Sequence, residues 1–227
     1  MTTYNIAIDG PAGAGKSTIA RKAAAELGFI YVDTGAMYRA MALYFIRKGI
    51  GRDDEKAIEE ACGDMDISLR HQDGVQQVLL NGEDVSGLIR TEEVSRMTSA
   101  VSVYGPVRAK LLELQRELAG RENVIMDGRD IGTCVLPRAQ TKIYLTASTR
   151  VRALRRFREL EEKGQMCNLE EIEHDITERD YRDMHRDIAP LKQADDAVLI
   201  DSSDMTIDQV VGAIVDAARA RGLSDGR

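Results

Sequence analysis

The segment YNIAIDGPAGAGKST, at residues 4–18, constrains what this chain can fold into more than any other stretch. An apolar run ends at Asp9, the motif G-x-x-x-x-G-K-S extends from Gly10 to Ser17, and good helix formers follow. A phosphate loop requires this setting, between a buried strand and a helix. Its glycines let backbone N–H groups turn toward phosphate oxygens, and the helix directs its positive dipole end at them.

The segment therefore predicts a site for a nucleoside triphosphate, rather than a glycine-rich turn that binds nothing. Lys16 supplies a positive charge for the transferred phosphate, and the Ser17 hydroxyl suits Mg²⁺. The predicted triphosphate-binding residues are Gly10, Pro11, Ala12, Gly13, Ala14, Gly15, Lys16, Ser17 and Thr18.

Length and charge limit the class of protein. The 227 residues fit one α/β domain with an insertion or a lid, so residues 1–227 are treated as a single domain. Lys and Arg number 31 against 38 Asp and Glu, and this net charge of −7 argues against a nucleic-acid partner. No stretch approaches about 18 apolar residues and no signal peptide is evident, so we expect a soluble, cytoplasmic protein without membrane contact. The widely spaced Cys62, Cys134 and Cys167 favour free thiols over disulfides or a zinc site.

Apolar runs alternate with helix-forming segments along most of the chain. Strands are expected at residues 4–9, 29–32, 124–127, 141–145 and 197–200. Helices are expected at 17–27, 34–48, 53–65, from 91, and at 106–119, 148–163, 169–187 and 205–221, with Thr34 and Ser148 as caps. The alternation predicts a parallel sheet covered by helices on both faces, with ligands at the carboxyl ends of its strands.

Residues 66–85 interrupt that alternation. Segments rich in β-favouring residues, at 67–70, 75–80 and 83–85, are separated by turn signals at 71–74 and at Asn81-Gly82. Asn-Gly is a strong hairpin turn. We therefore expect a small three-stranded meander that is inserted into the domain and does not join the main sheet. With its neighbouring helices it forms a subdomain at about residues 34–105.

Four of the expected strands end in polar residues: Asp9-Gly10, Asp33-Thr34-Gly35, Asp127-Gly128-Arg129-Asp130 and Asp201-Ser202-Ser203. Because the carboxyl ends of parallel strands share one edge, we expect these clusters to meet in one crevice. Asp127 occupies the usual place of an acidic residue beside Mg²⁺ in phosphate-loop enzymes, so it joins Ser17 as a candidate metal ligand. The alternative for Asp127 is a helix cap or turn. Arg129 is a bidentate donor suited to phosphate.

Arginines are concentrated at residues 148–187, on two expected helices. Acidic neighbours there permit a solvated face with ion pairs, which we expect for Arg150, Arg152 and Arg158. For Arg155, Arg156, Arg179 and Arg186 we expect a functional role. Two helices that carry such side chains can close over a triphosphate as a lid and exclude water.

The acceptor of the phosphoryl group is narrowed by chemistry. The Asn-Lys-x-Asp guanine-binding motif of Ras-like GTPases is absent from the sequence. An acceptor that is itself a phosphate has a second pKa near ~6 and needs no strong general base. The arginines outside the phosphate loop favour such an acceptor. The residues thus indicate a nucleoside monophosphate kinase, and they leave its base undetermined.

Four motifs, GPAGAGKST (10–18), DTGAMYR (33–39), DGRDIGT (127–133) and ERDYRDMHRDIAPL (178–191), together resemble the bacterial cytidylate kinase family. NGEDVSGLIRTEEV (81–94) resembles the insert of its long form, and the resemblance extends over residues 4–220. It implies phosphorylation of CMP and dCMP to CDP and dCDP by ATP with Mg²⁺, in pyrimidine nucleotide metabolism. It also implies the P-loop NTPase fold, with a five-stranded parallel sheet flanked by helices, a small antiparallel β insert and a helical arginine lid at about residues 148–187.

The resemblance further implies roles for single residues. It places Arg39, Arg129 and Arg186 on the acceptor phosphate, and Arg179 and Asp183 on the sugar. Thr34, Ser99, Arg108 and Asp130 would read cytosine, and Arg155 and Arg156 would lie near the transferred phosphoryl group. The implied catalytic residues are Lys16, Arg129, Arg155, Arg156 and Arg186. Thr34 stands where the family has serine, and His185 receives no role.

The chemistry of cytosine agrees with two of these roles. The Asp130 carboxylate can accept from the exocyclic amino group, and Arg108 can donate to the ring acceptors. Uracil would oppose a carbonyl oxygen to the same carboxylate. On sequence alone, Ser99 and Arg108 equally fit exposed helix positions. Another kinase, for uridylate or a non-nucleotide acceptor, and a non-enzymatic ATP-dependent switch are the alternatives. We expect a monomer, and the choice between CMP and dCMP stays open.

Overall fold

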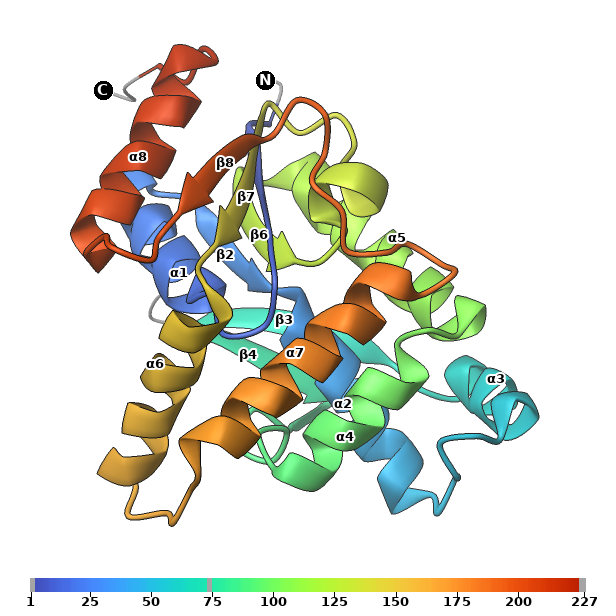
Figure 1. Ribbon diagram of the computed structural model, residues 1–227. Coiled ribbons are helices and arrows are strands. Elements are labelled where there is room, and N and C mark those ends of the chain that lie inside the picture. The colour runs from blue at the N-terminus through green and yellow to red at the C-terminus, as the bar shows by residue number, and fades with distance from the viewer. Residues whose placement is uncertain (1–2, 73–74, 225–227) are drawn as a thin grey trace.

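Five short segments form the central sheet, and all of its strands are parallel, in the order β2-β6-β1-β7-β8 (Figure 1). The computed structural model describes residues 3–72 and 75–224, so Asp73 and Gly74 of the predicted turn lie outside the described residues. The strands are β1 (Asn5–Asp9), β2 (Ile30–Asp33), β6 (Val124–Gly128), β7 (Thr141–Thr146) and β8 (Val198–Asp201). The predicted parallel sheet is thereby confirmed.

Alternating side chains of the sheet feed two separate cores. In β1, Ile6 and Ile8 pack into one core, and Ala7 packs into the other. Helices α1 (Lys16–Leu27) and α8 (Ile207–Ala220) cover the first core, and α2 (Thr34–Arg47) and α5 (Gly105–Arg121) contribute to the second. This is the period of two that a strand buried on both faces requires.

The other helices are α3 (Glu55–Gly63), α4 (Glu92–Val101), α6 (Thr149–Glu162) and α7 (Leu169–His185). Their starts follow local capping chemistry: the Thr91 hydroxyl accepts from the backbone N–H of Val94, and Ser148 accepts from that of Val151. Among the described residues, none of the helices is both long and apolar enough to cross a membrane.

The predicted meander is confirmed as a separate antiparallel sheet of β3 (Ile67–Gln72), β4 (Val75–Leu80) and β5 (Glu83–Asp84). Asn81 and Gly82 both have positive φ at its second turn, as the Asn-Gly signal requires. Gln76 joins this sheet to the end of β2: its Oε1 accepts from the Asp33 N–H at 2.9 Å, and its Nε2 donates to the Asp33 carbonyl at 3.3 Å.

The structure differs from the sequence predictions at two places, where one cap is wrong and one element was not predicted. Thr34 does not cap α2, because the Asp33 carboxylate accepts from the Ala36 N–H at 2.9 Å, while the Thr34 hydroxyl donates to the Asp127 carbonyl at 2.7 Å. The N-terminus of a helix favours the negatively charged neighbour as its cap. The second difference is a π-helical turn at Ile131–Val135, a segment for which no helix was predicted.

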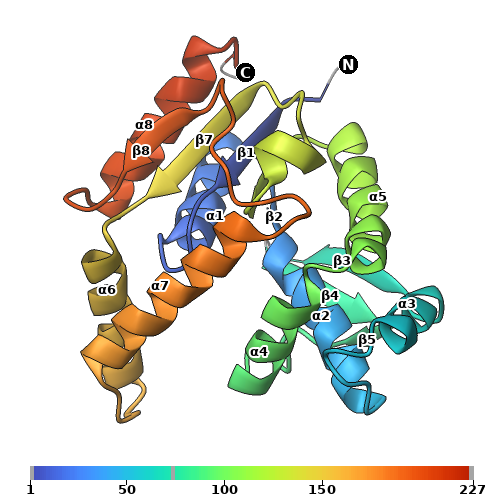
Figure 2. The ribbon, with the colours of Figure 1, turned by 45° about the vertical axis from the view of Figure 1, so that its right-hand side comes forward.

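Two groups of helices flank the carboxyl edge of the main sheet (Figure 2). Helices α6 and α7 lie side by side beyond the carboxyl ends of β7 and β8, and α2 and α4 lie side by side across from them. The carboxyl ends of the strands lie between the two groups, which is where an open α/β sheet binds its ligands.

Gly10 fixes how β1 turns into the phosphate loop. Its φ is +152°, and a Cβ built there would lie 1.9 Å from the carbonyl oxygen of Leu145 on the adjacent β7. The neighbour is backbone that hydrogen bonds of the sheet hold in place, so only glycine fits this close approach.

We predict that Gly10→Ala lowers the free energy of unfolding by more than about 2 kcal/mol, because the loop must move away from β7. Gly212→Ala is the matched control: Gly212 lies within α8 with nothing near its Cβ position, so this change should raise stability by up to about 1 kcal/mol. Urea unfolding of both variants measures the effect, and a wild-type midpoint for Gly10→Ala would contradict it.

Candidate active site

A cavity of about 700 Å³ lies at the carboxyl edge of the main sheet, between the two groups of helices. Its lining includes most of the residues that the sequence singled out, from the phosphate loop, α2, α4, α5, β6, α6 and α7. The predicted site residues in the lining are Gly13, Ala14, Gly15, Lys16, Ser17, Thr18, Thr34, Arg39, Ser99, Arg108, Asp127, Arg129, Asp130, Arg155, Arg156, Arg179, Asp183 and Arg186.

Three predicted residues of the phosphate loop lie outside that lining: Gly10, Pro11 and Ala12. Gly10 packs against β7, and Pro11 directs its carbonyl oxygen to Lys16 Nζ at 2.7 Å. The amide cradle that faces the cavity therefore begins at Gly13, and Gly13 and Gly15 adopt positive φ values of +74° and +83°.

Lys16 is almost fully buried and lies in a strongly charged neighbourhood. Burial, and then the nearby Arg129 guanidinium, hold the pKa of Lys16 well below its usual range. Phosphate groups in the cavity would offset the repulsion by Arg129, because they bring negative charge to an ammonium whose hydrogen-bond acceptor among the described residues is the Pro11 carbonyl. The position of Lys16 suits an anion.

Ser17 and Asp127 bring oxygen atoms together beside the loop. Ser17 Oγ donates to Asp127 Oδ2 at 3.1 Å, and the Tyr31 hydroxyl donates to Asp127 Oδ1 at 2.8 Å. Burial and the neighbouring Asp33 raise the pKa of Asp127 to about 6. A carboxylate in such surroundings gains from a cation nearby, and oxygen ligands are those that Mg²⁺ takes.

Arginines from three elements converge in the cavity close to the phosphate loop. Arg39 pairs with Asp33 at 3.0 Å and Arg129 pairs with Asp183 at 2.8 Å. The Nε atoms of Arg39 and Arg179 are buried and lack hydrogen-bond partners among the described residues. Burial, followed by the repulsion of Arg129, lowers the pKa of Arg179 to about 10. Unpaired donors under mutual repulsion predict a bound anion here.

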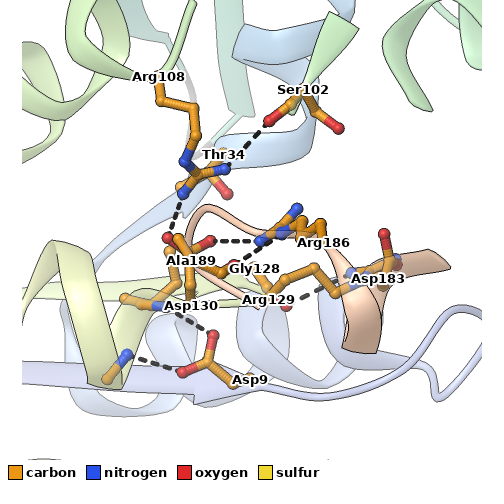
Figure 3. Close-up of polar contacts among 12 residues, drawn as sticks. Asp9, Thr34, Ser102, Arg108, Gly128, Arg129, Asp130, Asp183, Arg186 and Ala189 are labelled. Atoms are coloured by element: carbon orange, nitrogen blue, oxygen red, sulfur yellow. Dashed lines mark hydrogen bonds and ion pairs between the residues drawn. The ribbon is translucent and has the colours of Figure 1, made fainter. Parts of the chain in front are cut away.

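Asp130 joins the two sides of the cavity (Figure 3). Its carboxylate accepts from Arg108 Nη2 on α5 and, at 3.2 Å, from Arg186 Nη2 just after α7. Arg108 also donates to the Ser102 carbonyl at 3.3 Å, and its guanidinium lies over the Tyr38 ring at 5.8 Å. Ser99 lines the same region from α4. A planar base would find a carboxylate, a guanidinium and an aromatic ring together.

Asp9 supports this network from below. The two oxygens of its carboxylate accept from the Ile131 and Gly132 N–H groups, each at 2.7 Å, at the start of the π-helical turn (Figure 3). Burial raises the pKa of Asp9 to about 6, although these two hydrogen bonds oppose the shift. The turn directly follows Asp130, so Asp9 helps fix the position of that side chain.

The arginines of the lid helices have separate roles in the structure. Arg155 donates to the Ser202 carbonyl at 2.7 Å and to its hydroxyl at 3.3 Å, while Arg156 pairs with Glu159 at 3.0 Å. The expectation of a solvated face is wrong for Arg152, which is 4% exposed and pairs with Asp180 at 2.7 Å. Arg150 is exposed, as expected for a solvated face, and pairs with Glu173 on α7.

Sequence reasoning missed several residues of the cavity. Tyr38 and Asp33 belong to the motif DTGAMYR, yet they were given no role of their own. The wall beyond Arg155 consists of Ser202, Met205, Thr206, Ile207 and Val210, and the only sequence signal there was the polar end of the last strand. Of the polar strand ends, Asp9 and Asp201 do not line the cavity.

Comparison with known proteins adds independent findings. The sequence model of the family described as "Cytidylate kinase" matches residues 6–220. A protein named cytidylate kinase from Lactobacillus johnsonii is 53% identical, over 93% of this chain and 92% of its own length. One of the same name from Caldicellulosiruptor bescii is 49% identical, over 95% of this chain and 96% of its own. A crystal structure of an uncharacterized protein from Eubacterium ventriosum has a TM-score of 0.50 at 11% identity, covering 96% and 99% of the two chains, and shows a shared fold.

The raised pKa of Asp9 predicts how stability changes with pH. Its pKa in the folded protein, about 6, exceeds the ordinary value of 3.8, so the folded state binds more protons between these values. The stability that this group contributes is greatest below pH 4 and is lost as the pH rises through 6. Asp9→Asn has no group that titrates at this position. The free energy of unfolding of wild type minus that of the variant should therefore increase by about 1 kcal/mol from pH 7 to pH 5.

Urea unfolding without nucleotides at several pH values measures that difference, in which the other titrating groups cancel. The loss of one acceptor in Asp9→Asn adds a constant offset that does not depend on pH. A difference that stays constant, or that shrinks as the pH falls, would show that Asp9 is ionised throughout this range.

Proposed function

The chain belongs to the cytidylate kinase family, and from this premise we propose that it transfers the terminal phosphoryl group of ATP to CMP and dCMP. The observation that carries the proposal is one cavity that holds both an amide cradle at Gly13–Thr18 and five arginines (Arg39, Arg108, Arg129, Arg179 and Arg186) around a base pocket that contains a carboxylate. Two phosphorylated molecules fit end to end in such a site. We propose also that the enzyme acts as a cytoplasmic monomer.

We assign the cradle and Lys16 to the phosphates of ATP, together with the α1 N-terminus. Arg39, Arg129 and Arg186 would hold the acceptor phosphate, and their carboxylate partners Asp33, Asp183 and Asp130 keep the guanidinium groups oriented before the ligand arrives. Arg179 and Asp183 would contact the sugar.

The acceptor needs little activation. A phosphate monoester with its second pKa near ~6 is already nucleophilic at neutral pH, so no residue is assigned as a general base. Catalysis then rests on alignment and on charge stabilisation by Lys16, Arg129, Arg186, Arg155 and Arg156. Arg155 and Arg156 would exchange Ser202 and Glu159 for phosphate oxygens when the lid at about 148–187 closes and excludes water.

The base pocket favours cytosine over uracil. We assign Asp130 to the exocyclic amino group and Arg108 to the ring acceptors, with Thr34 and Ser99, on the subdomain at about 34–105, as further residues that read the base. The ion pairs that Asp130 makes with Arg108 and Arg186 fix the direction of its two oxygen atoms at this position. The same carboxylate disfavours the binding of UMP, which argues against a uridylate kinase, the nearest alternative function.

A divalent cation normally accompanies ATP in this reaction, and we propose Mg²⁺ at Ser17 and Asp127. Their oxygen atoms are 3.1 Å apart at the phosphate loop, and this donor set fits a hard cation. When bound, Mg²⁺ would neutralise charge on the phosphate oxygens.

The proposed reaction is tested by a coupled assay of ADP release with CMP, dCMP, UMP, AMP and GMP as acceptors. We expect the highest kcat/KM among the ribonucleotides for CMP, with CDP as the product. Faster turnover of UMP or AMP would contradict the assignment of the base, and slow ATP hydrolysis without CDP would instead indicate an ATP-dependent switch.

We predict that Asp130→Asn narrows the preference for CMP over UMP by about 5- to 150-fold, because the amide can donate to the uracil carbonyl that a carboxylate repels. The ratio of the two kcat/KM values measures this effect. Asp216→Asn, an exposed change on α8, is the control and should leave the ratio unaltered. The same ratio in Asp130→Asn as in wild type would remove Asp130 from base recognition.

We predict further that chelation with EDTA abolishes activity and that added MgCl₂ restores it. Asp127→Asn should raise the Mg²⁺ concentration for half-maximal rate by at least about 10-fold, since one charged oxygen ligand is lost. Titration of the rate with MgCl₂ at saturating ATP measures this requirement. An unchanged Mg²⁺ requirement in the variant would show that Asp127 does not hold the metal.

A further inference from the structure

The outer side of the phosphate loop is bound to both lid helices through one residue, Ala12. Its N–H donates to Asp180 Oδ1 of α7 at 3.1 Å, and its carbonyl accepts from Arg152 Nη1 of α6 at 2.7 Å. Arg152 and Asp180 are themselves an ion pair at 2.7 Å. One ion pair between α6 and α7 therefore binds both the N–H and the carbonyl of Ala12.

The other two guanidinium nitrogens of Arg152 also have partners within the protein. Its Nε donates to the Ala147 carbonyl at 2.9 Å, and its Nη2 donates to the Thr149 hydroxyl at 3.1 Å. The residue is 4% exposed and Asp180 is 7% exposed. With each guanidinium nitrogen already bound, Arg152 is suited to hold protein groups in place rather than to take up a phosphate.

Packing leaves the loop little freedom at this contact. A Cβ built on Gly13 would lie 3.4 Å from Arg152 Cβ and 3.8 Å from Ile176 Cδ1. Ile176 and Asp180 are four residues apart on α7, so one face of that helix supplies both an apolar contact and the acceptor for Ala12. Gly13, the first glycine of the cradle, is therefore in contact with both lid helices, and it directly follows Ala12, which the ion pair binds.

We infer that Arg152 and Asp180 are positioning residues for ATP: their ion pair sets the orientation of the Ala12 peptide groups and, through them, of the cradle amides that start at Gly13. The inference rests on the proposed ATP site. Because the pair joins α6 to α7, the cradle has its binding shape only while these two helices keep their present register. The lid helices thereby shape the phosphate loop as well as covering it.

A purely structural ion pair would behave differently. Replacing a buried ion pair by apolar side chains of similar size often leaves stability unchanged, whereas the loss of one partner leaves an uncompensated charge. The double variant Arg152→Met/Asp180→Leu removes both charges and the contacts to Ala12 together. It therefore tests the effect of the pair on the conformation of the phosphate loop without leaving an unpaired buried charge that would destabilise the fold.

The matched control is the second ion pair between the same helices, Arg150 with Glu173, at 2.7 Å. Neither residue lines the cavity or contacts the phosphate loop in the described structure. Arg150→Met/Glu173→Leu therefore removes an ion pair between α6 and α7 without touching Ala12.

Binding of ATP alone, measured by isothermal titration calorimetry, is the primary readout, so an error in the assigned acceptor leaves the result intact. We expect Arg152→Met/Asp180→Leu to bind ATP about 10-fold more weakly than wild type, and the control pair to bind it normally. In steady-state kinetics, KM for ATP should rise and KM for CMP should stay constant. Equal ATP affinity in the double variant and wild type, or equal weakening in the control, would overturn the inference.

Arg152→Lys serves if the double variant does not fold. Lysine keeps a positive charge for Asp180, but its single ammonium cannot reach the Ala12, Ala147 and Thr149 oxygens together. We expect a several-fold rise in the ATP dissociation constant with a melting temperature near that of wild type. Wild-type ATP affinity in this folded variant would likewise overturn the inference.

Discussion

Pairing of buried or half-buried arginines with aspartates is the interaction on which the cavity depends. Taking an isolated charge out of water is costly, and each partner offsets that cost for the other. Asp33, Asp130, Asp180 and Asp183 each accept from an arginine that was brought to the same edge of the sheet. A chain with a net charge of −7 can thereby keep an anion site, because the charge around these arginines differs from the net charge of the whole chain.

The same aspartates connect the site to the fold. Asp33 caps α2 with its carboxylate, orients Arg39, and is gripped through its backbone by Gln76 of the inserted sheet. Asp9 in turn holds the turn that follows Asp130. Side chains of this kind fulfil two requirements at once: they satisfy backbone groups at the ends of elements, and they set the direction of the guanidinium groups. The inserted sheet is therefore part of the support of the acceptor end.

Local signals carried most of what could be predicted from sequence. The phosphate loop, the Asn81-Gly82 turn and the Ser148 cap depend on neighbours within a few residues, so the sequence predicts them. Arg152 was misjudged because a run of arginines does not reveal which face of the helix becomes buried; Asp180 decides this from 28 residues further along. The π-helical turn could not be predicted for a similar reason, since its first N–H groups donate to Asp9, which lies more than 120 residues earlier. The family motifs contain other residues of the lining, among them Arg39, Arg129 and Arg186, whereas the wall at Met205–Val210 lies outside every such motif.

The strand order β2-β6-β1-β7-β8 has a consequence for how the chain is made. The first strand to leave the ribosome occupies the middle of the sheet, and its two neighbours, which start at Val124 and Thr141, are synthesised more than a hundred residues later. During translation β1 has no partner, while the local β3–β4 hairpin has its whole sequence available much earlier. Such long-range pairing slows folding, and the apolar segment Ile6-Ala7-Ile8, which is fully buried in the folded protein, stays without its neighbouring strands and open to aggregation until β6 emerges.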